Sequence, residues 1–332
     1  MRVFLTGATG FVGSVLVPKL LKMPSLDRLK ILKLAGEPVP ESWNHDRVQV
    51  IESDLLNRKQ LIEGMTGATH VIHLAGLISY RQADAKKLEA VNVGGVENII
   101  AACLQHRIRR LVHISSVGGI GFHPDGRAAD EEVPFNWPRH FHYMTTKYRG
   151  QQVVREAMEK NGLDAVILNP ASIMGPGDPN PATPHNQLYH RLFKGRMIGS
   201  FSGGLAVVDV RDLVAIILKS LTKKSFAHDR YLVVGHNIRY PDLLRMMGEI
   251  AGKKVYPFRV PAWLITLAGG LSERVCRLLG TRPLLTYSYG KISGMTGFYD
   301  HQRSIREFHH RYLPMKTTIQ DSCEYYRSRF LS

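Results

Sequence analysis

The chain has 332 residues, of which 44% are hydrophobic and 22% are charged. This length exceeds that of one small domain, so we expect a large α/β unit with an added lobe. The composition excludes wholesale disorder, and no stretch approaches the ~20 apolar residues of a membrane-spanning helix. The three cysteines lie outside C-x-x-C pairs and metal-ligand spacing, so we expect neither disulfides nor a metal.

The charge is strongly and unevenly basic. The net charge is +16, and residues 221–332 contain 18 Lys and Arg against 8 Asp and Glu. Such a field favours phosphate-bearing cofactors, anionic lipid surfaces or nucleic acid, whereas the alternative is a solvated basic face. Glycine-rich sequence begins at Gly7, too soon for the apolar core of a signal peptide, so we expect a cytoplasmic protein.

Short β-branched runs alternate with longer amphipathic stretches through the first two-thirds of the chain. This alternation is typical of right-handed crossovers and a parallel sheet covered on both faces. The expected fold is α/β, a Rossmann-type doubly wound parallel sheet with a smaller, mostly helical C-terminal lobe for the substrate. We predict strands over residues 2–6, 29–34, 48–51, 70–74, 110–115 and 165–169, and helices over 85–106 and 141–161.

The alternation breaks at a loop rich in proline, glycine and asparagine over residues 170–183. A strand-like run at 231–234 predicts one return to the sheet before helices over 240–251, 261–279 and 317–330. The second lobe is therefore expected from two separated stretches. We assign residues 1–170 and 204–236 to the domain built on the parallel sheet, and residues 171–203 and 237–332 to the second lobe.

Three glycines follow the first predicted strand and open a helix. Gly7 permits a tight turn, Gly10 lets the backbone approach a pyrophosphate, and Gly13 lets the helix pack close to the strand. The helix N-terminus then faces the phosphates. An ordinary glycine-rich turn is the alternative interpretation of this motif taken alone.

A tyrosine and a lysine four residues apart begin the helix predicted near residue 141. Tyr143 and Lys147 project from one helix face, and an ammonium beside a phenol favours the tyrosinate that acid–base chemistry needs. Ser115 and Ser116 end the fifth strand at the carboxyl edge, where open α/β sheets bind ligands. A surface pair and a simple turn are the alternative readings of these two motifs.

The order and spacing of these motifs resemble the extended branch of the short-chain dehydrogenase/reductase superfamily, the NAD-dependent epimerase/dehydratase family. Within it, the chain is most similar to the dihydroflavonol-reductase and 3β-hydroxysteroid-dehydrogenase-like group. The resemblance implies catalytic roles for Ser116, Tyr143 and Lys147, with Ser115 as the competitor for Ser116. It implies substrate contacts from Tyr80, Ser116 and Val117, and cofactor contacts from Gly7, Thr9, Gly10, Phe11, Val12, Gly13, Lys33, Asp54, Leu55, Leu74, Ala75, Gly76, Asn92, Tyr143, Lys147, Pro170 and Ile173.

The choice between NAD and NADP depends on the end of the second strand. An acid there binds the ribose 2′-hydroxyl, whereas a basic residue accepts a 2′-phosphate. Lys33 lies near this position and Glu37 follows it, so we favour NADP through Lys33 and keep NAD as the alternative.

These features predict an NAD(P)-dependent oxidoreductase that interconverts a ketone and a secondary alcohol on a lipophilic or cyclic small molecule. The first alternative is a nucleotide-sugar epimerase or dehydratase with tightly bound NAD. The second is a non-catalytic NAD(P)-binding protein with an anionic partner. No nucleic-acid module accompanies the basic residues, so we do not expect a nucleic-acid partner.

Three further segments carry expectations about packing and partners. We expect Arg211 and Asp212 to form an ion pair that holds the lobes together. The apolar run at 261–271, followed by Arg274 and Arg277, predicts a helix that covers the substrate pocket, with peripheral membrane contact as the alternative. The helices at 85–106 and 141–161 suit a homodimer interface as well as packing on the sheet.

Overall fold

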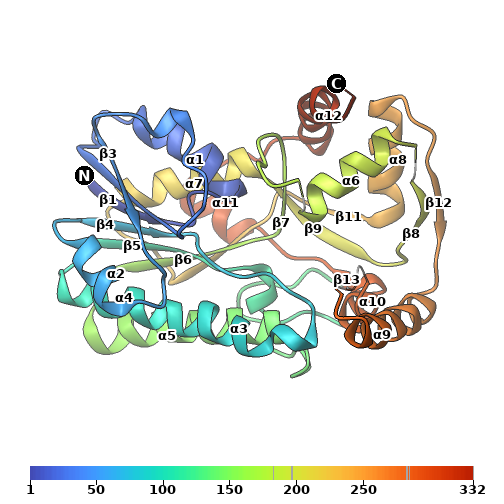
Figure 1. Ribbon diagram of the computed structural model, residues 1–332, viewed down its shortest axis with the longest axis horizontal. Helices are drawn as coiled ribbons and strands as arrows, with labels where there is room; N and C mark the ends of the chain where they lie inside the picture. Colours follow the sequence, from blue (N-terminus) through green and yellow to red (C-terminus); the bar gives the residue numbers. More distant parts are fainter. Residues whose placement is uncertain (182, 196, 282, 284, 332) are drawn as a thin grey trace.

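Seven parallel strands form the central sheet of the computed structural model, which describes residues 1–181, 183–195, 197–281, 283 and 285–331 (Figure 1). Their order reverses between β1 and β4, the kind of position where open α/β sheets bind ligands. The six early strands lie where the sequence predicts them, and the predicted return is the edge strand β10. In sheet order they are β10 (Arg230–Val233), β6 (Ala165–Pro170), β5 (Arg110–Ile114), β4 (His70–His73), β1 (Arg2–Thr6), β2 (Arg28–Lys33) and β3 (Val48–Glu52).

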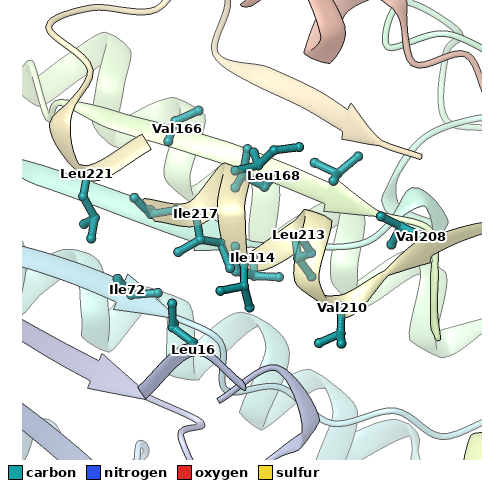
Figure 2. Close-up of a cluster of buried hydrophobic side chains, with 14 of the residues drawn as sticks. Leu16, Ile72, Ile114, Val166, Leu168, Val208, Val210, Leu213, Ile217 and Leu221 are labelled. Carbon is teal, nitrogen blue, oxygen red and sulfur yellow. The ribbon is translucent and has the colours of Figure 1, made fainter. Parts of the chain in front are cut away.

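Helices cover both faces of this sheet (Figure 1). On one face lie α1 (Phe11–Leu21) and α7 (Val210–Thr222), which share the apolar cluster drawn in Figure 2. On the other lie α2 (Arg58–Met65), α4 (Gly95–Gln105) and α5 (His142–Asn161). Both sheet faces are therefore buried, which explains the continuously apolar strands.

The helix predicted over residues 85–106 is interrupted. It consists of α3 (Ala85–Glu89), a π-helical turn η3 (Ala90–Gly94) and α4. A π turn holds one residue more than an α turn, and such turns occur often at functional sites. The apolar periodicity on either side made the whole stretch look like one regular helix.

Outside the central sheet, the chain contains more strand than the sequence predicts. A four-stranded sheet joins β11 (His236–Arg239), β9 (Gly204–Asp209) and β13 (Thr296–Gly297), with β7 (Ser172–Met174) also paired to β9, and β8 (Ile198–Ser200) pairs with β12 (Tyr256–Arg259). Apart from β9, these strands have two to four residues, too few to show a clear alternation of apolar and polar residues. The remaining elements are η1 (Glu41–Trp43), η2 (Gln82–Asp84), η4 (Val117–Gly119), α6 (Pro184–Phe193), α8 (Tyr240–Ala251), α9 (Ala262–Leu278), α10 (Tyr287–Ser293), α11 (Gln302–Phe308) and α12 (Met315–Leu331).

The expected ion pair between Arg211 and Asp212 is wrong, although both side chains do tie distant segments together. Arg211 instead binds Asp209, at 2.7 Å, and Asp321 of α12. Asp212 accepts hydrogen bonds from His310 at 2.9 Å and from the backbone of Leu313 at 3.0 Å. Adjacent helical residues point in different directions, so neighbours in the sequence find different partners.

No helix in the described part of the chain is long and apolar enough to cross a membrane.

Candidate active site

The glycine turn after β1 leaves an open backbone surface at the start of α1. Gly7 has φ +73°, and a Cβ there would lie 2.6 Å from the backbone nitrogen of Ala75. A Cβ on Gly13 would lie 2.2 Å from the Ala8 carbonyl oxygen. At Gly10 the nearest atom is 3.5 Å away, and no side chain caps α1 there. Gly7 and Gly13 thus permit close packing, while Gly10 leaves room for a phosphate at the helix N-terminus.

The neighbouring strand ends form the walls of this surface. Leu55 is buried against Gly95, whereas Asp54 is exposed and accepts a hydrogen bond from the Leu56 backbone at 2.8 Å. The Ala75 backbone donates to Thr6 at 3.3 Å, which joins the turn after β4 to β1. The other predicted cofactor residues of this region are half-buried or exposed around the turn, namely Thr9, Phe11, Val12, Leu74 and Gly76. A dinucleotide therefore fits these residues.

Lys33 ends β2 with its ammonium already engaged. It is buried and donates to Glu52 of β3 at 2.7 Å and to the Leu34 carbonyl at 3.0 Å. Glu37 turns back toward the same strand end and accepts a hydrogen bond from the Leu34 backbone at 3.0 Å. The basic and acidic candidates for recognising the ribose thus lie together at this strand end.

Tyr143, Lys147 and Ser116 come together at the carboxyl edge of β5. Tyr143 and Lys147 lie one turn apart in α5 and are both buried. A Cβ on Gly118 would lie 3.4 Å from the Ser116 hydroxyl oxygen and 3.6 Å from the Tyr143 ring, so both side chains face the same point. Burial raises the pKa of Tyr143, and the neighbouring Ser116 hydroxyl acts in the opposite direction. Burial lowers the pKa of Lys147 to about 8. Its ammonium donates to the Ile114 carbonyl at 3.3 Å.

Ser116 and Ser115 have different surroundings. Ser116 is half-buried, and its hydroxyl accepts a hydrogen bond from the Gly118 backbone at 3.0 Å. Ser115 is buried, and its hydroxyl has no hydrogen-bond partner among the described residues. Successive residues of an extended chain point to opposite sides, so only one of the two faces Tyr143. Val117 opens the short turn after Ser116 and is half-buried.

Asn92 is held in the π turn and braces the loop after β4. Its side chain accepts from the Leu77 backbone at 2.8 Å and donates to the Leu77 carbonyl at 3.0 Å and to Thr146 at 3.2 Å. A Cβ on Gly76 would lie 3.3 Å from the Asn92 oxygen and 3.2 Å from the Lys147 nitrogen. Asn92 therefore positions the backbone beside Lys147.

Two histidines that the sequence did not single out as site residues form a buried layer below Lys147. His73 and His113 stack in adjacent strands with ring centres 5.3 Å apart. Burial, followed by the Lys147 charge, lowers the pKa of His73 to about 3. Burial, His73 and Lys147 lower the pKa of His113 well below its ordinary value. Both rings are thus neutral near pH 7, so Lys147 carries the positive charge here.

A small pocket reaches Tyr143 from the side of the second lobe. The Tyr80 ring lies 5.8 Å from that of Tyr143 and 5.9 Å from that of Tyr289 in α10. Gln82 donates to Ser288 at 3.0 Å across 206 residues of sequence. The sequence singled out Tyr80 but not Gln82, Ser288 or Tyr289, because no motif links segments so far apart. The pocket is lined by Ser79, Tyr80, Arg81, Gln82, His140, Phe141, His142, Tyr143 and Ser288.

The loop that leaves the sheet completes the site. Pro170 is buried at the end of β6, and Ile173 is half-buried in β7. The Phe11 ring of the glycine turn stacks on His185 of α6, with ring centres 5.4 Å apart. In the part of the chain that the structure describes, no three His, Cys, Asp or Glu residues are grouped to hold a metal ion.

A model of the NAD dependent epimerase/dehydratase family matches residues 3–235, and the chain belongs to this family. A candidate dihydroflavonol 4-reductase of Synechocystis sp. is 30% identical over 329 residues, covering 98% of this chain and 94% of the relative. Sterol demethylase protein B of Methylococcus capsulatus is 28% identical over an alignment of 334 residues, which covers 99% of this chain and 99% of the relative. The chain is thus an NAD(P)-dependent enzyme of the short-chain dehydrogenase/reductase type.

Solved structures share the fold over the whole length. The crystal structure of gox2253 has a TM-score of 0.82 and 26% sequence identity, and the match covers 99% of this chain and 98% of that one. The expected Rossmann-type fold and family are therefore confirmed.

Proposed function

We propose that this enzyme interconverts a ketone and a secondary alcohol on a lipophilic or cyclic small molecule. The observation that carries the proposal is that the Ser116 hydroxyl and the Tyr143 ring face the same point beside Gly118, with Lys147 one helical turn from Tyr143 at the carboxyl edge of the sheet. Tyr143 also belongs to an apolar cluster with Trp137, Phe141 and Met144. This apolar wall favours an apolar substrate, whereas Arg81 in the adjoining pocket is a charged group that the diphosphate of a nucleotide sugar would use.

The proposed chemistry divides between cofactor and protein. The bound nicotinamide supplies or accepts the hydride at the substrate carbon. In reduction, Ser116 orients the carbonyl oxygen and Tyr143 donates its proton to that oxygen, which gives the alcohol. The Lys147 ammonium stabilises the tyrosinate that remains. In oxidation, the same tyrosinate takes the proton back from the alcohol.

Cofactor preference is part of the proposal. The sequence favours NADP through Lys33, but the ion pair of Lys33 with Glu52 supplies an argument for NAD. A 2′-phosphate would compete with Glu52 for the Lys33 ammonium. Glu37 carries a carboxylate close to the same strand end.

Nicotinamide fluorescence during titration with NADH and with NADPH tests cofactor binding and preference. A panel of ketones and alcohols tests the proposed redox reaction. Tyr143→Phe is expected to keep dinucleotide affinity and to lose turnover by roughly 10²–10⁴-fold. Lack of turnover with every ketone and alcohol would contradict the proposal. Co-purified NAD with epimerisation and no net redox change would favour the epimerase alternative.

A homodimer through the outer faces of α4 and α5 is also proposed. Their inner faces pack on the sheet, while a groove between them is lined by Ala101, Leu104 and Val153 among charged residues. Sedimentation velocity tests this, because Leu104→Glu would place a charge in the interface and is expected to yield monomers.

A further inference from the structure

Helix α9 presents an apolar face to solvent along its whole length. From Leu264 onward its large apolar residues recur every three or four positions, and each of these residues and Trp263 is 44% to 87% exposed. Isolated exposed apolar residues are ordinary, but a continuous row on one helix marks a contact surface. The row, here called the α9 face, consists of Trp263, Leu264, Leu267, Leu271, Val275 and Leu278.

The opposite side of α9 fixes the direction of this face. Ile265, Thr266 and Gly269 are buried. A Cβ on Gly269 would lie 2.3 Å from the Thr286 carbonyl oxygen, and one on Gly290 would lie 2.4 Å from the Thr266 Cα. Glycines on both helices thus let α9 pack tightly on α10, and no rotation of α9 can bury the α9 face.

The charges of α9 are sorted between the two sides. Arg274 and Arg277 are exposed, at the C-terminal half of the α9 face. Glu273 is the sole acidic residue of this helix and accepts a hydrogen bond from the Tyr287 backbone at 3.2 Å. The acid is therefore used to cap α10, while both cations remain available to a partner.

We propose that the α9 face docks on an anionic lipid surface. An amphipathic helix binds such a surface by burying its apolar row among the acyl chains, while basic side chains contact the headgroups. The net charge of +16 acts in the same direction. A second copy carries the same net charge of +16 and offers no matching acidic surface on α9, where the one acid is turned to α10, so an anionic partner is favoured over self-association.

The position of α9 links docking to the proposed function. Figure 1 shows α9 beside α10, in the second lobe. Ile292 of α10 and Met295 just beyond it pack against the apolar cluster that contains Tyr143. If the substrate is lipophilic, as proposed above, a docked enzyme takes it from the bilayer along α10. Uptake of the substrate from the bilayer rests on the proposed function, whereas docking on the lipid surface does not.

Co-sedimentation with vesicles tests docking without any need for turnover. The wild type is expected to bind vesicles of phosphatidylcholine with phosphatidylserine more tightly than vesicles of phosphatidylcholine alone, and to bind less as salt rises. The double variant Leu267→Ser/Leu271→Ser is expected to lose most binding to both. Val39→Ser/Leu56→Ser, which removes exposed apolar side chains outside α9, is the matched control and should bind like the wild type.

A variant without the two arginines separates the electrostatic contribution to vesicle binding from that of the apolar side chains. Arg274→Gln/Arg277→Gln should weaken binding to anionic vesicles roughly 25-fold, or about 1 kcal/mol for each arginine, and leave binding to neutral vesicles unchanged. NADH titration of every variant shows whether the fold survives. A wild type that binds neither vesicle overturns docking, as does a Leu267/Leu271 variant that binds like the wild type. Docking without ketone turnover would contradict only the proposed function.

Discussion

The Lys147 ammonium is buried, and burial makes its positive charge unfavourable for the stability of the folded chain. The pKa of its ammonium is lowered from 10.5 to about 8 in the folded chain. The unfolded chain therefore binds more protons between these two values, and stability rises with pH across that window. Below pH 8 the buried charge costs about 3 kcal/mol.

Replacing this charge should stabilise the enzyme and inactivate it. Without dinucleotide at neutral pH, Lys147→Met is expected to raise the free energy of unfolding by up to about 3 kcal/mol. The gain should shrink at about pH 10, because the wild type then also loses the charge. Urea unfolding of the variant and the wild type at neutral pH and at about pH 10 measures this gain in the free energy of unfolding. Lys160→Met, an exposed change in the same helix, should alter stability by less than about 0.5 kcal/mol, and an equal gain there would refute the explanation.

The ion pair at the end of β2 gives a second prediction at the scale of residues. Glu52→Gln removes the carboxylate that competes for the Lys33 ammonium. The variant is therefore expected to bind NADPH more tightly, by roughly threefold to tenfold, with NADH affinity almost unchanged. Fluorescence titration measures both. An unchanged ratio of the two affinities would mean that Lys33 does not contact the 2′-position.

At the scale of elements, the start of α1 depends on two glycines for different reasons. Gly13→Ala brings a methyl group against the Ala8 backbone and should cost about 1–3 kcal/mol of stability. Gly10→Ala meets no protein atom closer than 3.5 Å, so stability should change little while dinucleotide affinity falls. Urea unfolding and NADH titration distinguish the two variants. Full affinity in Gly10→Ala would exclude this turn as the phosphate site.

The sequence predicted elements well where a single local pattern determines them. The parallel strands read as apolar runs because helices cover both faces, and the glycine turn is defined by its spacing. The π turn at Asn92 was missed because one added residue leaves the apolar pattern of α3 and α4 intact. Gln82 and Ser288 were missed because only the folded chain brings them together.

At the scale of the whole molecule, one buried carboxylate joins α7 to α12. Asp209 accepts hydrogen bonds from the Arg211 backbone and side chain and from Thr318 at 2.7 Å. Asp209→Asn leaves Arg211 with a weakened partner and is expected to cost about 3–5 kcal/mol. Asp321→Asn, which changes the more exposed partner of Arg211, should cost less than about 1 kcal/mol. Equal costs in urea unfolding would contradict the central role of Asp209.

The π turn also limits how the chain can vary in length. The π turn takes up one extra residue without changing the faces that α3 and α4 present, so deleting one residue from Ala90–Gly94 would restore a regular helix and displace the Asn92 side chain. The Asn92 bridge to Leu77 and Thr146 would then be lost, together with the brace beside Lys147. We therefore expect the chain length through Ala90–Gly94 to be fixed, because a residue added or removed there would displace the Asn92 side chain from Leu77 and Thr146.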